Sequence, residues 1–477
     1  MNVLDSFDLV IIGSGPAGEK AAARAAYFGK KVALVEKEPV LGGAAANTGT
    51  LPSKTLRETA LFLSGFRNRE LYGIQLRLKD KVTVRDFLAR ERLVKEQERA
   101  RVMENLKRHK VTLFKGTASL HDAHTVCVQP SRCPPFLLRG NILLIATGSY
   151  PYRPPGFPFH DPRVYDSDTI LTLHEIPASM LVVGGGVIGC EYACMFAALG
   201  VQVTLIEKRD TLVGFLDHDL AAALQQQMQA MGVRLLLGNG VAAVEPGPCL
   251  TVRCQGGEVL QTQTILISSG RCGATEGLGL EKVGIQPTER GHIPVNAQYQ
   301  TTVPSIYAAG DVIGFPALAS TAMEQGRIAV SNAFNLAFRH DLAALLPYGL
   351  YTIPECSMVG DTEEGARRKG LPIVVGRANY SANARGQIIG DRVGFLKLIF
   401  HEDDMRLLGV HIIGEMATEL VHVGQAALAC GASVDLFIQS CYNYPTLTEL
   451  YKYAAYDALG KLNLKREGRA QPTANDA

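Results

Sequence analysis

Two glycine-rich segments of this 477-residue chain have the residue types and the spacing needed to bind dinucleotides. Each has three glycines followed by an acidic residue, and in both copies the first glycine and the acid lie 23 positions apart. The glycines allow a tight turn and a close approach of the backbone to a pyrophosphate, while the acid accepts hydrogen bonds from a ribose. The two copies are Gly13, Gly15, Gly18 with Glu36, and Gly184, Gly186, Gly189 with Glu207. The repeat predicts two dinucleotide sites.

Each motif is preceded by the pattern of a buried strand and followed by the pattern of a helix. In the first copy we expect a strand over residues 9–12, a helix over 17–28 and a second strand over 31–35. The corresponding segments of the second copy are 180–183, a helix that ends near 199, and 201–206. Strands alternating with helices predict parallel sheets, and therefore two Rossmann-like α/β domains.

The overall composition argues against nucleic-acid and membrane partners. The 48 Lys and Arg residues nearly balance the 46 Asp and Glu residues, so the formal charge is only +2 and no overall field favours anionic polymers or lipids. No apolar run approaches the ~18 residues of a membrane helix, and the first apolar segment leads into a glycine motif rather than into an export signal. We expect a soluble cytoplasmic protein.

The ten cysteines form no regular framework and are expected to be reduced, mostly buried thiols. Cys190 and Cys194 lie four positions apart on a predicted helix, a spacing that rarely meets disulfide geometry. The histidines and cysteines also lack the spacing of a ligand set, so no metal site is expected.

Further motifs resemble those of the pyridine nucleotide-disulfide oxidoreductase family over nearly the whole chain. They lie at residues 49–54 (GTLPSK), 163–168 (RVYDSD), 310–314 (GDVIG), 351–355 (YTIPE) and 443–446 (NYPT). Within the family, the chain is most similar to the soluble, si-specific NAD(P)+ transhydrogenases. The resemblance implies a domain for FAD, an inserted domain for NAD(H) or NADP(H), and a C-terminal α+β dimerisation domain. It therefore also implies a homodimer or a higher homo-oligomer.

We expect the FAD domain at residues 1–150 and 276–346, the nicotinamide domain at 151–275 and the dimerisation domain at 347–465. A proline-rich linker after Gly148 marks the first boundary. The charge-dense segment 83–109 predicts a solvated helix packed on the FAD domain. In the last domain we expect a strand pair at 394–400 and 407–413 and a helix at 425–430. The polar residues 466–477 predict a disordered tail.

The family resemblance assigns the chemistry to Lys54 and Glu191. Lys54 is expected near flavin N5, where its ammonium stabilises the anionic reduced flavin, and Glu191 is expected to pair with it and contact the nicotinamide carboxamide. Asp311 is expected to bind the ribityl chain of FAD. The remaining cofactor contacts are expected from Gly42, Gly43, Thr50, Gly116, Thr147, Gly148, Gly270 and Gly310.

Two departures from the family remove its thiol chemistry. The disulfide reductases have cysteines at the positions of Ala45 and Thr50, and the transhydrogenases usually keep the first. The histidine that exchanges protons with those thiols is replaced by Tyr444, whose phenol has an ordinary pKa near ~10. We expect Tyr444 to pack in the dimer interface. A dithiol relay is excluded, so the hydride must leave the flavin by another route.

Three functions are compatible with this pattern. A transhydrogenase would bind NADPH, reduce the flavin, release NADP+ and return the hydride to NAD+, with ping-pong kinetics. An NAD(P)H oxidase or quinone reductase would pass the electrons to oxygen or a quinone. A non-enzymatic flavoprotein sensor is the third, but retention of Lys54, Glu191 and both glycine motifs favours an enzyme. We therefore expect the transhydrogenase.

The acid of the second motif bears on nucleotide choice. Glu207 suits the ribose of NAD(H), and Lys208 and Arg209 could neutralise it toward the 2′-phosphate of NADP(H). We expect one site that uses both nucleotides, with an NADH-only enzyme as the alternative.

Overall fold

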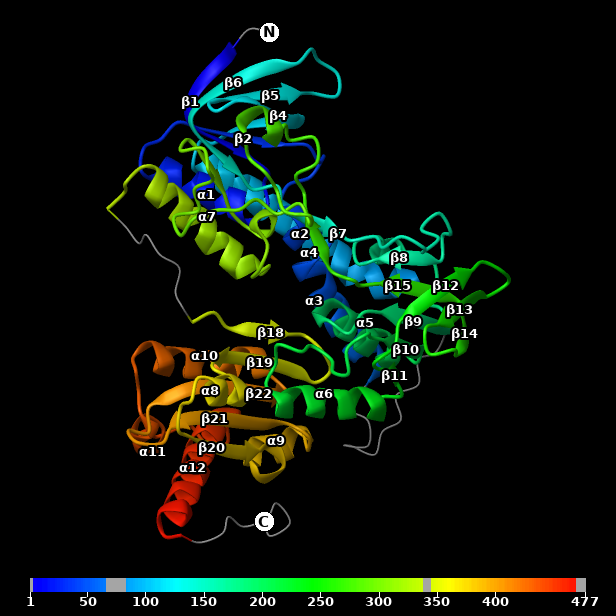
Figure 1. Ribbon diagram of the computed structural model, residues 1–477, viewed down its shortest axis with the longest axis vertical. Helices are drawn as coiled ribbons and strands as arrows, with labels where there is room; N and C mark the ends of the chain where they lie inside the picture. The colour runs from blue at the N-terminus through cyan, green and yellow to red at the C-terminus, as the bar shows by residue number, and fades with distance from the viewer. Residues whose placement is uncertain (1–2, 66–82, 338–344, 469–477) are drawn as a thin grey trace.

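Three large β-sheets organise the computed structural model, which describes residues 3–65, 83–337 and 345–468 (Figure 1). Two sheets are largely parallel and contain the glycine motifs, and the third is antiparallel and is formed by C-terminal residues. In Figure 1 the first sheet lies at the top, the second at the right and the third at the bottom. The predicted fold class, two dinucleotide-binding α/β domains with a C-terminal α+β domain, is confirmed.

The first sheet has the order β3-β2-β1-β6-β5-β4, and β17 pairs with β6. Its strands are β1 (Val3–Ile12), β2 (Val32–Glu36), β3 (Thr112–Lys115), β4 (Thr117–Asp122), β5 (Thr125–Gln129), β6 (Phe136–Ile145) and β17 (Ile306–Ala308). Residues such as Leu9 and Val10 are fully buried on both faces, as expected for parallel strands covered on both sides. Strand β17 is contributed by the chain after it returns from the second sheet.

Helices cover the first sheet and carry its site residues. They are α1 (Pro16–Tyr27), α2 (Gly43–Asn47), α3 (Thr50–Ser64), α4 (Val84–Arg108) and α7 (Ala319–Ala333). The helix predicted over 83–109 is confirmed as α4, and a reciprocal capping box between Thr83 and Asp86 fixes where it begins. Buried residues of α4, among them Val102 and Leu106, pack in the core of this domain.

The second sheet has the order β11-β10-β9-β15-β8. Its strands are β8 (Val164–Asp166), β9 (Ser179–Val183), β10 (Gln202–Ile206), β11 (Arg234–Leu236) and β15 (Thr264–Ile267). Helices α5 (Val187–Ala198) and α6 (His218–Ala230) and a small sheet of β12 (Val241–Glu245), β13 (Leu250–Cys254) and β14 (Val259–Thr262) complete this region. Both predicted strand–helix–strand repeats are present.

A two-stranded ribbon connects the first two sheets. Strand β7 (Ser149–Pro151) carries the chain toward the second sheet, and β16 (Arg271–Gly273) pairs with it antiparallel on the way back. The ribbon belongs to neither large sheet, so the domain boundaries near 150 and 275 stay predictions.

The C-terminal sheet has the order β18-β19-β22-β21-β20. Its strands are β18 (Tyr348–Leu350), β19 (Glu355–Gly360), β20 (Ile373–Asn379), β21 (Phe395–His401) and β22 (Leu407–Gly414). Its helices are α8 (Glu363–Arg368), α9 (Ala384–Ile389), α10 (Ala417–Ala429), α11 (Val434–Gln439) and α12 (Leu450–Arg466). The predicted strand pair is confirmed as β21 and β22.

Two expectations for the C-terminal region need correction. The helix predicted at 425–430 is the second half of α10, which begins at Ala417. The tail predicted from Arg466 begins too early, because Arg466 is the last residue of α12. Lys465 and Arg466 suit a helix end, where basic side chains interact favourably with the helix dipole. Residues 469–477 lie outside the described part of the chain.

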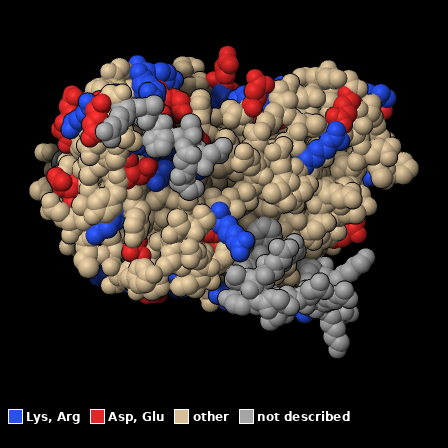
Figure 2. Space-filling model, turned by 90° about the horizontal axis from the view of Figure 1, so that it is seen from below, with Lys and Arg blue, Asp and Glu red and all other residues tan. Residues whose placement is uncertain are grey.

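The surface carries both signs of charge. On the face shown in Figure 2, basic and acidic side chains are interspersed and neither gathers into a large patch. Among the helices of the described ranges, none combines the length and the apolar character needed to cross a membrane.

The contact between α1 and α7 provides a stability test. A Cβ added at Gly326 of α7 would lie 2.2 Å from the carbonyl oxygen of Ala17 on α1, so this contact needs glycine. We expect Gly326→Ala to lower the free energy of unfolding by about 1–3 kcal/mol, because the backbone of α1 must move. Gly460 of α12 is the matched control, since an added Cβ there meets nothing within 4 Å.

Gly460→Ala should instead leave stability unchanged or raise it by up to about 1 kcal/mol. Urea unfolding followed by circular dichroism measures both variants. Equal stability of Gly326→Ala and the unmodified chain would contradict the close packing of the two helices.

Candidate active site

An ion pair at the centre of the site joins helix α3, beside the first sheet, to helix α5, beside the second. Lys54, in the first turns of α3, donates from Nζ to both carboxylate oxygens of Glu191 on α5, at 2.8 and 2.6 Å. Glu191 is only 3% exposed, whereas Lys54 is 26% exposed. A carboxylate so buried needs a nearby cation, because an unpaired buried charge is strongly unfavourable. The structure therefore brings together the two residues to which the sequence assigned the chemistry.

Tyr351 contacts both members of this pair. Its backbone N–H donates to Oε1 of Glu191 at 2.9 Å, and its ring lies 4.9 Å from Nζ of Lys54, within the range of a cation–π interaction. No role was expected for Tyr351 beyond its place in a family motif. Only the folded chain shows that the segment after β18 reaches the lysine of α3.

Arg57 links the same helix to the C-terminal sheet. Its guanidinium is 2% exposed, donates from Nε to the carbonyl oxygen of Thr352 at 2.9 Å, and lies 3.2 Å from Oε1 of Glu355. The other oxygen of Glu355 accepts a hydrogen bond from the hydroxyl of Thr418 on α10 at 2.8 Å. These contacts hold α3 against the segment 351–355, and so fix the position of Lys54 relative to that segment.

The first glycine motif has the geometry of a dinucleotide-binding turn. Gly13 has a φ of +105°, and an added Cβ would lie 2.4 Å from the carbonyl oxygen of Ala146. A Cβ at Gly18 would lie 2.0 Å from the carbonyl oxygen of Gly13, so helix and strand meet only with glycine there. Gly15 precedes Pro16 at the start of α1, where the free N–H groups of the first turn favour a phosphate.

Glu36 is held at the end of β2, beside this turn. One carboxylate oxygen accepts hydrogen bonds from the N–H and hydroxyl of Ser14, at 2.9 and 2.6 Å, and the other accepts from the N–H of Glu38 at 2.9 Å. The backbone N–H of Gly116 donates to the carbonyl oxygen of Glu36 at 3.0 Å, which brings the start of β4 to the same place. Contact of Glu36 or Gly116 with a ribose stays a prediction.

Two features near the end of β6 fit a bound FAD. The hydroxyl of Thr147 is buried and has no hydrogen-bond partner among the described residues. Next to it, Gly148 has a φ of +73° and open space where a Cβ would stand. An unpaired buried hydroxyl beside open space is the environment that a polar ligand would complete. Gly310 has a φ of +82°. The carboxylate of Asp311, the next residue, accepts a hydrogen bond from the hydroxyl of Ser149 at 2.9 Å.

The segment 42–50, which carries Ala45 and Thr50, also lies against the first glycine motif. A Cβ at Gly43 would lie 2.8 Å from Cα of Gly15, and the N–H of Gly42 donates to the hydroxyl of Ser14 at 3.2 Å. Ala45 is half-buried on α2, and Thr50 is exposed at the start of α3. The backbone that would present a dithiol is thus in place, but neither position carries sulfur.

The second motif repeats the geometry of the first. A Cβ at Gly184 would lie 2.6 Å from the carbonyl oxygen of Ser268, and one at Gly189 would lie 1.9 Å from the carbonyl oxygen of Gly184. Gly186 begins α5 with open space beside it, and Gly270, with a φ of +100°, is open as well. The start of α5 is therefore accessible to a phosphate.

Glu207 is anchored between this motif and the loop that follows β10. It accepts from the N–H of Gly185 at 2.6 Å and from the N–H of Arg209 at 3.0 Å, and the Arg209 guanidinium lies 3.2 Å from it. Burial raises the pKa of Glu207, but the hydrogen bonds from Arg209 and the backbone outweigh it and hold the pKa below its ordinary value. Lys208 is exposed beside it.

The buried cysteines are poor nucleophiles. Cys190 and Cys194 of α5 and Cys356 of β19 are fully buried and free. Burial raises the pKa of the Cys194 and Cys356 thiols to about 12 and raises the pKa of Cys190 well above its ordinary value. A thiol that stays protonated does not attack a disulfide, so α5 carries no replacement for the missing pair.

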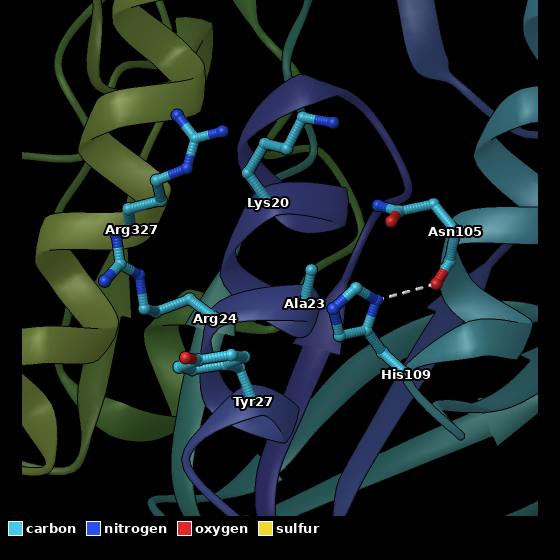
Figure 3. Close-up of a pocket in the computed structure, with 7 residues that line it drawn as sticks. All are labelled: Lys20, Ala23, Arg24, Tyr27, Asn105, His109 and Arg327. Carbon is cyan, nitrogen blue, oxygen red and sulfur yellow. Dashed lines mark hydrogen bonds between the residues drawn. The ribbon is translucent and has the colours of Figure 1, made fainter.

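A cavity on the first domain lies apart from the candidate site. A surface cavity of about 410 Å³ between α1, α4 and α7 contains none of the predicted site residues (Figure 3). It is lined by Lys20, Ala23, Arg24, Tyr27, Asn105, His109 and Arg327. Among the described residues there is no group of three or more His, Cys, Asp or Glu side chains that could hold a metal ion.

Known proteins are similar to this chain over nearly its whole length. Residues 7–326 match the family model described as pyridine nucleotide-disulphide oxidoreductase, and residues 346–455 match its dimerisation domain. A soluble pyridine nucleotide transhydrogenase of Mycobacterium bovis is 46% identical over 97% of this chain and 99% of its own length. A protein with the same name from Chromohalobacter salexigens is 39% identical over 96% and 99%.

Two solved structures have the same fold. LpdA from Mycobacterium tuberculosis has a TM-score of 0.87 and 27% identity, with 94% of this chain and 98% of that chain covered. The HOCl-induced flavoprotein disulfide reductase RclA from Escherichia coli has a TM-score of 0.85 and 28% identity, with 94% and 99% covered.

The contact between Tyr351 and Lys54 predicts a kinetic effect. We expect Tyr351→Leu to slow reduction of the bound flavin by NADPH by about 2-fold to 30-fold, because a cation–π contact contributes ~0.5–2 kcal/mol. Tyr351→Phe keeps the ring and serves as the control, with a rate within about twofold of the unmodified protein. Stopped-flow absorbance of the flavin measures both rates. Equal rates for the Leu and Phe variants would show that the ring does not act on Lys54.

The burial of the three thiols predicts resistance to alkylation. With a pKa of about 12, only about one thiol in ten thousand is ionised near pH 8, so iodoacetamide should leave Cys194 and Cys356 unmodified in the native protein. The exposed Cys133 and Cys430 should be labelled, and hydride transfer should continue. Peptide mass spectrometry after labelling, with urea-unfolded protein as the control, reads out each site. Loss of activity together with labelling of Cys190 would contradict the inert character of α5.

Proposed function

Because the chain belongs to the pyridine nucleotide-disulphide oxidoreductase family, we propose that it is an FAD-dependent transhydrogenase that transfers hydride between NADPH and NAD+ without a disulfide relay. One observation carries the proposal. Lys54 pairs with the buried Glu191, whereas Ala45 and Thr50 carry no sulfur where the resemblance would put a dithiol. The protein keeps what hydride exchange needs and lacks what disulfide reduction needs.

Bound FAD supplies a ring that takes up a hydride from one nucleotide and gives it to the next. The first glycine motif, Thr147 and Asp311 are the residues that would hold it. Lys54 would present its ammonium to the ring of bound FAD and offset the negative charge that reduction brings. Glu191, which pairs with this ammonium, would keep it in position and offer a carboxylate oxygen to the carboxamide of a nicotinamide.

A transhydrogenase of this kind needs one nucleotide site that accepts both substrates. Glu207, which accepts from the N–H of Gly185, would bind the ribose of NAD(H). The Arg209 side chain is 57% exposed and lies against Glu207, so it can turn toward a 2′-phosphate without unfolding the loop. The si stereospecificity of the hydride transfer at the nicotinamide and the use of Lys208 are part of the same proposal.

The bacterial relatives support this function, since both carry the name of a soluble transhydrogenase over nearly their full length. The disulfide-reductase title of one structural relative does not transfer, because this chain lacks both thiols.

The dimerisation domain at residues 346–455 indicates a homo-oligomer. We propose a homodimer in the cytoplasm, with Tyr444 in the interface. Its ring is 74% exposed in the single chain, and a second subunit would remove this apolar surface from water. Size-exclusion chromatography with light scattering distinguishes a dimer from a larger assembly.

Half-reactions test the proposed transfer. The bound flavin is reduced anaerobically with NADPH, freed of nucleotide, and mixed with thio-NAD+, oxygen or a quinone in separate experiments. We expect thio-NAD+ to restore the oxidised flavin spectrum fastest and at a rate that supports steady turnover. Lipoamide and glutathione disulfide serve as controls and should not reoxidise it.

Reoxidation by oxygen or quinone alone would replace the transhydrogenase with an oxidase or quinone reductase. A flavin that neither NADPH nor NADH reduces would indicate a non-enzymatic flavoprotein.

A further inference from the structure

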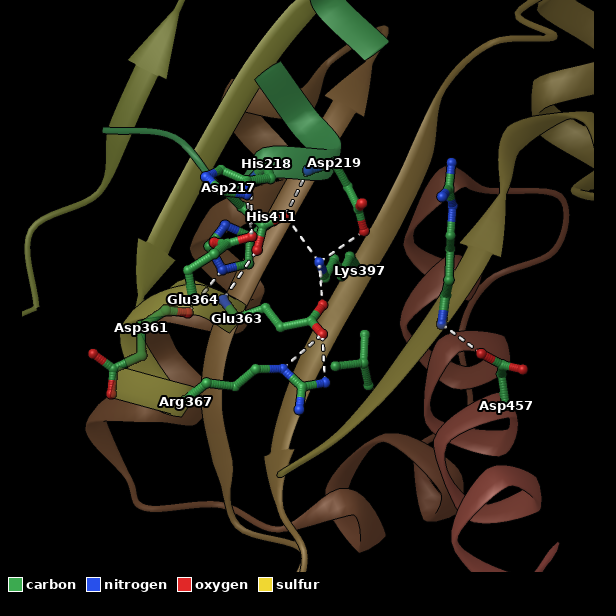
Figure 4. Close-up of polar contacts among 12 residues, drawn as sticks. Asp217, His218, Asp219, Asp361, Glu363, Glu364, Arg367, Lys397, His411 and Asp457 are labelled. Atoms are coloured by element: carbon green, nitrogen blue, oxygen red, sulfur yellow. Dashed lines mark hydrogen bonds and ion pairs between the residues drawn. The ribbon is translucent and has the colours of Figure 1, made fainter. Parts of the chain in front are cut away.

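A buried ammonium joins the second domain to the C-terminal sheet. Lys397 of β21 is 1% exposed, and its Nζ lies 2.9 Å from Asp217, 2.8 Å from Asp219 and 2.7 Å from Glu363 (Figure 4). Burial lowers the pKa of Lys397, but the three carboxylates outweigh it and raise the pKa above its ordinary value. The side chain therefore stays charged.

Asp217 is the central carboxylate of this cluster. It is fully buried, and one oxygen accepts from the N–H of Asp219 at 3.1 Å, which caps α6. Its other oxygen accepts from the N–H of Glu363, the first residue of α8, at 3.0 Å. The start of α6 is thus attached to the C-terminal domain by both a backbone contact and an ion pair.

The loop that ends at Asp217 runs back to the second glycine motif. The N–H of Leu216 donates to the carbonyl oxygen of Val213 at 2.9 Å, and the N–H of Val213 donates to that of Gly185 at 2.9 Å. Val213 is 1% exposed with a φ of +44°, a conformation that a β-branched residue holds only when its surroundings require it. The fully buried Leu212 fills the space beside Gly185, 2.6 Å from where a Cβ would stand.

The loop 209–217 also contacts Glu207, the acid that is expected to bind a ribose. Gly185 donates its N–H to Glu207, and Arg209, at the start of the loop, does the same. An unbroken series of contacts therefore runs from Lys397 through Asp217 and the loop 209–217 to Gly185 and Glu207.

We propose that Lys397 is a positioning residue for the nicotinamide nucleotide. By fixing Asp217, it holds the loop 209–217 in the strained form that places Gly185 and Glu207 for the adenosine half of NAD(H) or NADP(H). The C-terminal domain thereby influences nucleotide affinity through this loop. This inference rests on the nucleotide site of the proposed function, but not on which acceptor takes the hydride.

The test compares variants by nucleotide binding to the oxidised, FAD-loaded protein. Lys397→Met should raise the dissociation constants of NADP+ and NAD+ by about 5-fold to 50-fold. The KM values for NADPH and NAD+ should rise by a similar factor, with kcat at saturation changed less than about threefold. Lys461→Met is the matched control, because it removes an exposed lysine that pairs with Asp457 in the same domain. It should leave binding within about twofold of the unmodified protein.

Lys397→Arg, which keeps the charge, should restore most of the affinity. Unfolding by urea and flavin content are measured in parallel, because a purely structural role would lower stability without changing the dissociation constants of the folded fraction.

Unchanged dissociation constants in FAD-loaded Lys397→Met would overturn the proposal. If Lys397→Met yields no folded protein, Asp217→Asn is tested in its place. The amide oxygen of this variant still caps α6, but its contact with Lys397 loses one charge. Unchanged dissociation constants in Asp217→Asn would likewise overturn the proposal. Because these constants are measured without turnover, a failure of hydride transfer to NAD+ would refute the proposed function and leave this test intact.

Discussion

The structure depends on the need to neutralise one buried carboxylate. Glu191 is almost entirely enclosed, and its partners come from two other regions of the chain: Lys54 from α3, and the N–H of Tyr351 after β18. A buried charge without such partners would strongly destabilise the fold. The contact between Lys54 and Glu191 at the candidate site therefore also fixes how three sheets meet, and Arg57 reinforces the same junction.

The need to neutralise Glu191 does not involve Ala45 and Thr50, the positions at which the disulfide reductases have cysteines. The helix and turn that would present a dithiol are intact, and Gly43 still packs on Gly15, yet Ala45 and Thr50 leave no sulfur there. Nothing in the ion pair, the glycine motifs or the Glu207 contacts depends on those two side chains. The nucleotide-binding framework is therefore complete without sulfur at these two positions.

The glycine motifs were predictable from the sequence because their requirement is local. A turn that brings a strand and a helix within 2.0 Å of a missing Cβ admits only glycine at Gly18, and the following strand and acid lie at a fixed distance along the chain. The pairing of Lys54 with Glu191 was available only from the family resemblance, since 137 positions separate them.

The roles of Tyr351, Arg57 and Lys397 could not be found from local patterns at all. Each acts on a partner from a distant element, and a lone tyrosine, arginine or lysine has no periodicity that marks it. Helix α10 shows the same limit in a simpler form, because only its second half was predicted, whereas it begins at Ala417, which packs in the C-terminal core.

The place of β17 has a consequence for synthesis of the chain. This strand pairs with β6, but 160 residues, including the whole second sheet, separate the end of β6 at Ile145 from the start of β17 at Ile306. Because a ribosome releases the chain from its N-terminus, the second sheet can form while the first still lacks its returning strand. The topology thus allows the second sheet, which lies wholly within this insertion, to be completed on the nascent polypeptide before β17 joins the first sheet.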